Sequence, residues 1–132
     1  MVDLHREPGH QVVKKEKRLR SGRREGTLPS ISVRIVRVPW LIPGWARAQA
    51  WGRVILVKRG VQLTRDLLAH ELAHVLQWRA LGAGGFMWRY ACHQIRRGYR
   101  ENPLEISARV AEKEEFFLGW AREILRARGS ER

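Results

Sequence analysis

The chain is poor in cysteine, since Cys92 is the only one among 132 residues. A single cysteine cannot form an internal disulfide, and such scarcity favours a reducing compartment. Hydrophobic residues make up 44% of the chain, which is enough for a compact core without disulfides. No run reaches the roughly 18 uncharged apolar residues that span a bilayer, and residues 1–20 lack the apolar segment of a secretory signal. These absences predict a cytoplasmic protein without a transmembrane segment.

Acidic residues are also scarce. The chain has 13 Asp and Glu against 26 Lys and Arg, which gives a formal net charge of +13. Such an excess attracts nucleic acid and acidic surfaces unspecifically, and it carries no information about the fold. Residues 1–29 combine high charge with few large apolar side chains. We expect them to be a disordered basic tail, with a nucleic-acid-binding arm as the alternative, and residues 30–132 to form a single domain.

Two stretches after the tail have the composition of β-strands. Residues 31–38 are rich in Val and Ile with partial alternation, and residues 51–60 have a Val-Ile-Leu-Val centre. Prolines and a glycine between them predict a loop over residues 39–51. We expect the tryptophans of this loop to pack inward, with a partner-facing or membrane-facing surface as the alternative. The two strands are then candidates to pair with each other.

Three helices are predicted in the second half of the chain. Thr64 has the side chain of an N-cap, and the apolar residues after it recur at helical spacing. Gly82 and Gly98 are typical of positions just after a helix end, and Asn102 followed by proline is typical of a helix start. The expected helices cover residues 64–82, 86–97 and 102 to about 128, the last with a bend near Gly119.

The stretch LLAHELAHVLQW, residues 67–78, places three ionisable side chains in an otherwise apolar helix. His70 and His74 are four residues apart, so both imidazoles lie on one helix face and can bind one metal ion. Glu71 flanks that metal and can accept a proton from a water whose pKa zinc lowers toward about 7. Ordinary helix histidines are the alternative, but burying all three groups without partners would be costly. The pattern therefore predicts a metal site with Glu71 as general base.

A catalytic zinc takes three protein ligands and keeps one open position, so a third ligand must come from later in the chain. Cys92, His93, Glu101 and Glu105 have suitable side chains. We expect Cys92 in the core and His93 on the surface, because their spacing is not typical of ligands. Glu105 has a defined direction as the third residue after Asn102. It could instead complete a capping box with Asn102, and composition does not separate the two roles.

Together, LLAHELAHVLQW and the later YRENPLEISAR resemble the small gluzincin-type zinc metallopeptidase domains, most closely a set of short bacterial members without a known substrate. The match covers roughly residues 33–111. It implies that Glu105 joins His70 and His74 as the third ligand of one Zn²⁺ per chain. It also implies an α+β, zincin-like fold, a minimal gluzincin whose small twisted antiparallel sheet packs on the active-site helix, with two further helices. An extended substrate would lie along an edge strand, for which residues 51–59 are the candidate.

These features predict a zinc-dependent metallopeptidase that hydrolyses a peptide or protein substrate, with Glu71 as general base and acid. Tyr90 and Tyr99 are the tyrosines available to stabilise an oxyanion, but core packing is the expected role of both. The alternative is a basic module that binds nucleic acid or protein and holds a structural or vestigial metal. A structural zinc usually has Cys or His in its fourth position, and the sequence offers no evident fourth ligand.

Overall fold

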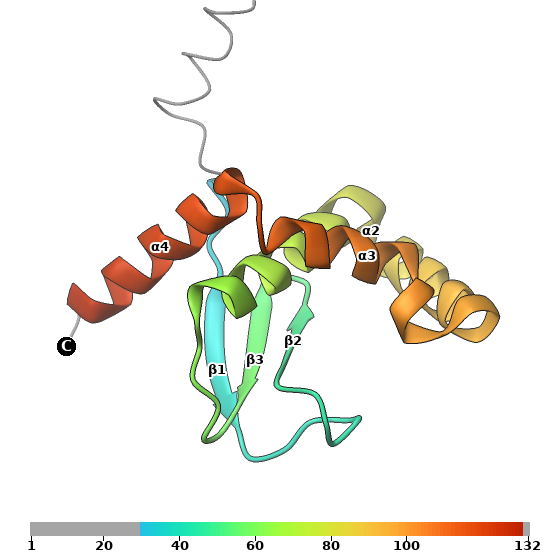
Figure 1. Ribbon diagram of the computed structural model, residues 1–132, viewed down its shortest axis with the longest axis horizontal. Coiled ribbons are helices and arrows are strands. Elements are labelled where there is room, and N and C mark those ends of the chain that lie inside the picture. The colour runs from blue at the N-terminus through green and yellow to red at the C-terminus, as the bar shows by residue number, and fades with distance from the viewer. Residues whose placement is uncertain (1–29, 131–132) are drawn as a thin grey trace, which may run out of the picture.

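The computed structural model describes residues 30–130, so the predicted basic tail, residues 1–29, lies outside the described part of the chain. Three strands are followed by three helices, in the order β1, β2, β3, α2, α3, α4 (Figure 1). The α+β class predicted from the sequence is confirmed. None of the helices described for residues 30–130 combines the length and the apolar character needed to cross a membrane.

The sheet is small and mixed. It consists of β1 (Arg34–Val38), β2 (Ala48–Trp51) and β3 (Val54–Lys58), in the spatial order β1-β3-β2. β1 runs parallel to β3, whereas β2 runs antiparallel to it, so that Ile55 of β3 lies opposite a residue of each neighbour. The expected antiparallel sheet is therefore wrong in one of its two pairings. The loop after β1 carries the chain past the position of β3, so that β2 forms the other edge and β3 then pairs with both strands.

The predicted strand over residues 51–60 is divided in the structure. Trp51 ends β2, and Gly52, with a φ of 64°, turns the chain into β3. β2 has the sequence AQAW, without a β-branched residue, so its composition gives little indication of a strand. β3 is consequently the central strand, and the expectation that residues 51–59 form the edge is wrong. The edge that contacts α2 is β2.

α2 (Arg65–Glu101) contains the first two predicted helices. Its backbone leaves helical geometry at Gly82, with a φ of 74°, and at Gly98, with a φ of 76°. A side chain at such a φ would cost roughly 1–2 kcal/mol, so glycine permits both breaks. We call residues 65–81 the first segment of α2 and residues 83–97 the second segment. The helix ends predicted at the two glycines are confirmed.

The last predicted helix is two helices in the structure. α3 (Pro103–Ala111) and α4 (Glu115–Ser130) separate at residues 112–114, and not at a bend near Gly119. The N–H groups of these three residues donate to carbonyls three positions back, which tightens and ends the helix. The break lets α3 and α4 each pack on α2, and α4 adds Trp120 to the core beside β3.

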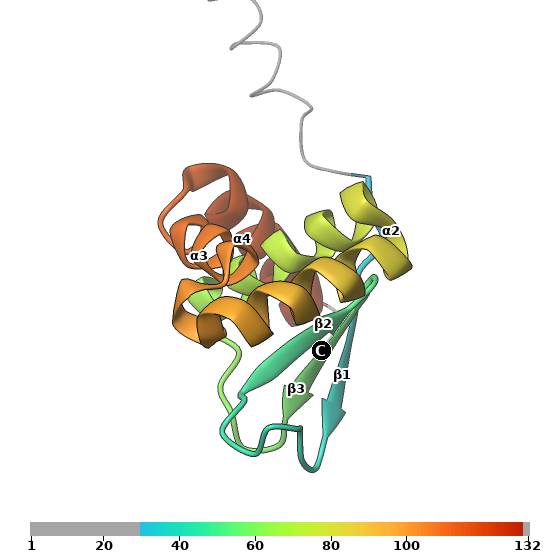
Figure 2. The same cartoon turned by 90° about the vertical axis from the view of Figure 1, so that its right-hand side faces the viewer.

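The main core lies between the sheet and the helices. Ile55 and Val57 of β3 pack with Leu68 and Leu72 of α2 and with Trp120 of α4. All five side chains are almost completely buried. In Figures 1 and 2 the sheet forms the lower part of the molecule, with α2 and α3 above it. This packing fixes the first segment of α2 against the sheet.

A second, smaller buried cluster joins α3 to α2. It contains Ala73 of α2 with Ala108 and Ala111 of α3. Alanine side chains occupy little space, so the two helices can approach closely. The N-terminal turn of α3 thereby comes to lie beside the middle of the first segment of α2.

Candidate metal centre

The first segment of α2 presents both histidines on one face. Its N-terminus is capped by Thr64, whose Oγ1 accepts the N–H of Leu67 at 3.2 Å. One helical turn separates His70 from His74, and their ring centroids are 5.0 Å apart. The geometry expected from the four-residue spacing is therefore present.

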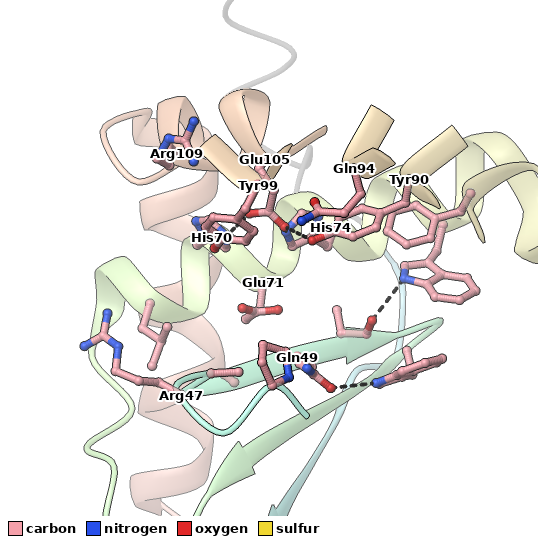
Figure 3. A pocket seen from close by; sticks show the side chains of 18 of the residues that line it. Arg47, Gln49, His70, Glu71, His74, Tyr90, Gln94, Tyr99, Glu105 and Arg109 are labelled. Atoms are coloured by element: carbon pink, nitrogen blue, oxygen red, sulfur yellow. Dashed lines mark hydrogen bonds and ion pairs between the residues drawn. The ribbon is translucent and has the colours of Figure 1, made fainter. Parts of the chain in front are cut away.

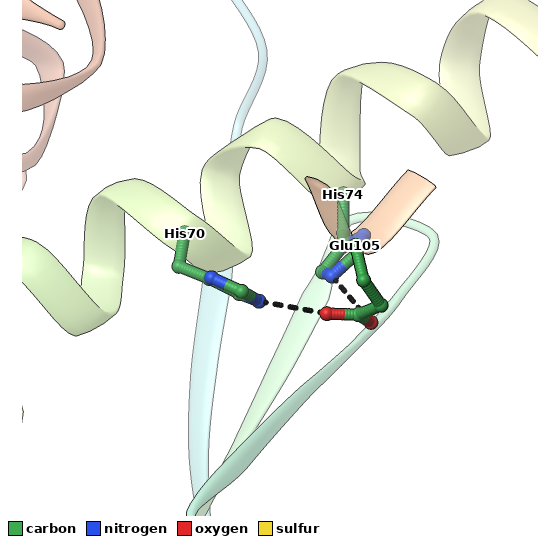
Figure 4. Close-up of side chains that lie close together, drawn as sticks. All are labelled: His70, His74 and Glu105. Atoms are coloured by element: carbon green, nitrogen blue, oxygen red, sulfur yellow. Dashed lines mark hydrogen bonds and ion pairs between the residues drawn. The ribbon is translucent and has the colours of Figure 1, made fainter. Parts of the chain in front are cut away.

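Glu105 reaches the histidine pair from α3. Its Oε2 lies 3.2 Å from Nε2 of His70, and its Oε1 lies 3.1 Å from Nε2 of His74 (Figure 4). One ligand atom from each of the three residues lies within 4.8 Å of the other two. His74 and Glu105 are buried, and His70 is partly buried. The three residues predicted as metal ligands are thus brought together, across 35 positions of the sequence.

This donor set fits a zinc ion. Zinc binds imidazole nitrogen and carboxylate oxygen at about 2.0–2.2 Å, so the ligand atoms of a tetrahedral site lie about 3.4 Å apart. The two N···O distances of 3.1 and 3.2 Å are close to that separation. Within residues 30–130, the group that could hold a metal has no fourth Cys, His, Asp or Glu. A metal held here would keep one position open for water or substrate.

Asn102 and Glu105 do not form a capping box. Asn102 is the N-cap of α3, since its Oδ1 accepts the N–H of Leu104 at 3.1 Å. The backbone N–H of Asn102 donates to the Tyr99 carbonyl, which is the bond that Glu105 would make in a capping box. The carboxylate of Glu105 faces the histidines instead. Of the two roles that the sequence leaves open for Glu105, the one in a capping box is therefore excluded.

The other candidate ligands lie apart from this group. Glu101 is exposed, and both Cys92 and His93 are partly buried on the second segment of α2. None of them belongs to the metal-capable group found within residues 30–130. Cys92 and His93 are both partly buried, so neither the expected core position of Cys92 nor the expected surface position of His93 is confirmed.

Two further side chains hold the histidines in place. Oε1 of Gln77 lies 2.8 Å from Nδ1 of His74, and the amide nitrogen of Gln77 donates to the carbonyl of Leu104 at 3.0 Å. Oε2 of Glu112 lies 3.6 Å from Nδ1 of His70. Partners of this kind orient a ligating imidazole and keep Nε2 directed at the metal. The sequence analysis missed both, although Gln77 lies one turn after His74 on the same helix face.

The two tyrosines take part in the site as well. The hydroxyl of Tyr90 donates to Oε1 of Glu105 at 3.0 Å. Burial raises the pKa of Tyr99 to about 12, and the negative charge of Glu105 adds to this effect. Both tyrosines line the cleft that contains the metal group. The expected role in core packing is therefore wrong, because the second segment of α2 folds back over the histidines.

Glu71 is buried beside the triad. Figure 3 shows it on the side of α2 that faces β2, close to the two histidines. Desolvation by burial raises the pKa of Glu71, while the neighbouring histidines and a hydrogen bond from the Ala50 backbone act in the opposite direction. Its Oε2 is buried and makes no hydrogen bond within residues 30–130. A buried carboxylate oxygen without a protein partner is costly, so this atom is available to accept a proton or a hydrogen bond from a bound molecule.

Glu105 and His74 shift each other's pKa in opposite directions. Burial alone would raise the pKa of Glu105, but hydrogen bonds to His70 and His74 outweigh it and hold the pKa well below its ordinary value. Burial opposes the charged form of His74, and the interaction with Glu105 more than offsets this, so the pKa of His74 is raised. Glu105 is therefore ionised at neutral pH, as a metal ligand must be.

The triad and Glu71 lie in a cleft of about 580 Å³. The loop between β1 and β2, the edge strand β2, both segments of α2 and the start of α3 provide its walls. The indole N–H of Trp78 donates to the carbonyl of Ala50 at 3.0 Å and so ties β2 to α2. Phe86 stacks on Trp78, with ring centroids 4.3 Å apart, which closes one end of the cleft with aromatic rings. This volume is within the range of ordinary ligand sites.

Comparisons of the chain with family models, with curated proteins and with solved structures find no match. The resemblance to gluzincin-type domains accordingly stays a prediction. The structure itself shows that two histidines and two glutamates, from α2 and α3, converge in one partly apolar cleft.

Proposed function

We propose that the chain is a zinc-dependent peptidase. The observation that carries this proposal is the buried, unpartnered Oε2 of Glu71 next to the group formed by His70, His74 and Glu105. A metal site alone needs only the three ligands. A fourth ionisable group, buried without a hydrogen-bond partner at that atom, is costly unless it handles a proton. The geometry thus supports catalysis over a purely structural metal, which would usually have a fourth Cys or His ligand.

In this proposal His70, His74 and Glu105 would hold the zinc, and a zinc bound there would supply the Lewis acid that polarises a peptide carbonyl and lowers the pKa of water. Glu71 takes a proton from the attacking water and returns it to the leaving amine, so that it ends the cycle ionised again. The raised pKa of Glu71 suits this exchange, because a base works best with a pKa near the operating pH. Gln77 and Glu112 act as positioning residues through the two imidazoles.

The edge strand β2 is the proposed backbone support for an extended peptide. The N–H of Lys58 donates to the carbonyl of Arg47, so this pair and every second pair after it bond β2 to β3. Ala48 and Ala50 therefore direct their backbone groups away from β3. The Ala50 carbonyl is taken by Trp78, which leaves Ala48 to pair with a substrate strand.

The test compares Glu71→Gln with the wild-type chain and with Glu114→Gln, which makes the same chemical change at an exposed position. We expect about one zinc per chain in all three proteins by metal analysis. Wild type and Glu114→Gln should cleave members of a peptide library followed by mass spectrometry, and Glu71→Gln should be slower by about 10²–10⁴-fold. Zinc binding without cleavage by the wild type would refute the peptidase and leave the metal centre. Full activity of Glu71→Gln would refute the role of Glu71.

A further inference from the structure

The loop between β1 and β2, residues 39–47, exposes large apolar side chains. Trp40, Ile42 and Trp45 are 66%, 75% and 64% exposed, whereas Leu41 and Ala46 between them are 5% and 7% exposed. The inward residues anchor the loop to the protein, and the outward ones meet solvent. The expectation that the loop tryptophans pack inward is therefore wrong for Trp40 and Trp45. Exposing this much apolar surface together is unfavourable, which marks the loop as a contact surface.

Hydrogen bonds hold this loop in its exposed form. The N–H of Ala46 donates to the carbonyl of Pro43 at 2.9 Å, which makes a tight turn. The ammonium group of Lys58 donates to the carbonyl of Gly44 at 2.8 Å, and the amide of Gln49 donates to the carbonyl of Ile42. These hydrogen bonds fix the turn, so its outward apolar side chains remain exposed to solvent.

The segment of the chain that contains the loop carries positive charge only. Residues 30–64 contain six Lys and Arg and no Asp or Glu. Strand register puts Lys58 beside Val38, and backbone bonds tie Arg47 to Lys58 and Arg59 to Val38, so these cations gather at the loop end of the sheet. Arg47 and Arg59 are exposed, and neither has an ion-pair partner in the described part of the chain. In Figures 1 and 2 this end of the sheet is the lower end of the molecule.

We propose that this loop docks the protein on an anionic phospholipid surface. Tryptophan and isoleucine insert at the boundary between headgroups and acyl chains, and arginine and lysine beside them pair with lipid phosphates. A loop and strands whose own charged residues are all cationic suit a membrane of negative charge. Ile42 is the most exposed of the large apolar side chains of the loop and is aliphatic, whereas a surface for single-stranded nucleic acid would stack bases on aromatic rings.

The docking loop is also a wall of the cleft. Ile42 and Trp45 line it, and the ring of Trp45 packs edge-on against Tyr99 with centroids 5.0 Å apart. Docking through this loop places this wall of the cleft next to the lipid headgroups. If the chain is a peptidase as proposed above, its substrates are then peptide segments close to a membrane surface. The docking itself does not depend on that activity.

The test measures co-sedimentation of the full chain with sucrose-loaded vesicles of phosphatidylcholine, with or without phosphatidylglycerol. The loop variant is Trp40→Ser with Ile42→Ser, and the matched control is Trp88→Ser with Ile95→Ser, which removes the same two side-chain types from exposed positions on α2. Neither pair of substitutions changes the net charge, and residues 1–29 are the same in all three proteins, so the tail cannot account for a difference in binding. We expect wild type and control to bind anionic vesicles and the loop variant to bind at least about tenfold more weakly. Circular dichroism checks that all three proteins unfold at similar temperatures.

Equal binding by wild type and loop variant would overturn the proposal, as would an equal loss in the matched control. Equal wild-type binding to neutral and anionic vesicles would overturn the role of the cations. A parallel titration with a single-stranded DNA oligonucleotide separates the alternative ligand. If the loop variant loses affinity for DNA but not for vesicles, the surface binds nucleic acid and the lipid proposal is wrong.

Discussion

At the residue scale, the candidate site depends on side chains that hold the proposed metal ligands in position. Gln77 illustrates this, because it bonds His74 through one end of its amide and the Leu104 carbonyl through the other. It therefore links the orientation of a ligand to the position of the helix that carries Glu105. Loss of a residue that orients a metal ligand typically lowers metal affinity by about 10–100-fold.

Replacement of Gln77 by Leu should weaken zinc binding by about 10–100-fold, because the imidazole of His74 loses the acceptor at Nδ1. Competition with a zinc chelator of known affinity measures this effect. Gln62→Leu makes the same change at an exposed position before α2 and should leave zinc affinity unaltered. Equal affinities for Gln77→Leu and Gln62→Leu would show that Gln77 does not position His74.

The sequence predicted part of the site at this scale. The spacing of His70, Glu71 and His74 is local, so helical geometry alone predicts their common location. Glu105 lies 35 residues from His70, and its direction depends on how α3 packs. Gln77 was missed, and Tyr90 was expected to pack in the core, because the roles of both come from contacts with α3, which no local pattern contains.

At the scale of elements, the start of α3 fixes the position of Glu105, the proposed third ligand. Asn102 is fully buried, caps α3 through Oδ1, and donates from its amide nitrogen to the carbonyl of Tyr90 at 3.3 Å. The side chain thus ties the second segment of α2 to the first turn of α3. Glu105 lies one turn beyond this tie.

Replacement of Asn102 by Ala should lower the free energy of unfolding by about 2–3 kcal/mol, since a cap is lost and buried partners are left unpaired. Zinc affinity should fall as well, because Glu105 loses its fixed direction. Thr64→Ala removes the cap of α2 and should cost about 1 kcal/mol without altering zinc affinity. Denaturant unfolding and chelator competition measure the two quantities. A zinc affinity that Asn102→Ala leaves unchanged would contradict the tie.

Because α2 breaks at Gly82, replacing Gly82 and replacing the nearby Gly84 with alanine should change the free energy of unfolding in opposite directions. Gly82→Ala should destabilise the chain by about 1–2 kcal/mol, because its φ of 74° strains any side chain although the surrounding space is open. Gly84→Ala, in helical backbone with equally open space, should stabilise the chain by about 0.5–1 kcal/mol. Thermal unfolding of the two variants checks this. Effects of the same sign would contradict the break.

Helices were easier to predict than the sheet. Thr64, Gly82, Gly98 and Asn102 mark helix ends through local backbone chemistry, and each lies where the structure begins, breaks or caps a helix. The strand β2 lacks β-branched residues and is fixed by pairing with β3 and by its contact with α2. Strand order depends on such tertiary contacts, so composition could not supply it.

At the scale of the whole molecule, charge and apolar surface are distributed unevenly. Three of the eight acidic residues within residues 30–130 are Glu71, Glu105 and Glu112, all at the metal group, and none lies within residues 30–64. The catalytic proposal and the docking proposal therefore concern two regions of opposite character. They meet at the cleft, where Trp45 of the docking loop packs against Tyr99 of α2. The net charge alone predicted neither region, because it reports no position.

The central claim is that α2 and α3 together form a three-ligand metal centre. Anomalous diffraction at the zinc edge, from crystals of the chain grown with one equivalent of zinc, tests it most directly. We predict one anomalous peak per chain, at about 2.0–2.2 Å from Nε2 of His70, Nε2 of His74 and a carboxylate oxygen of Glu105, with no fourth protein ligand. A chain without a peak at these residues, or a peak enclosed by a fourth side chain, would contradict the account.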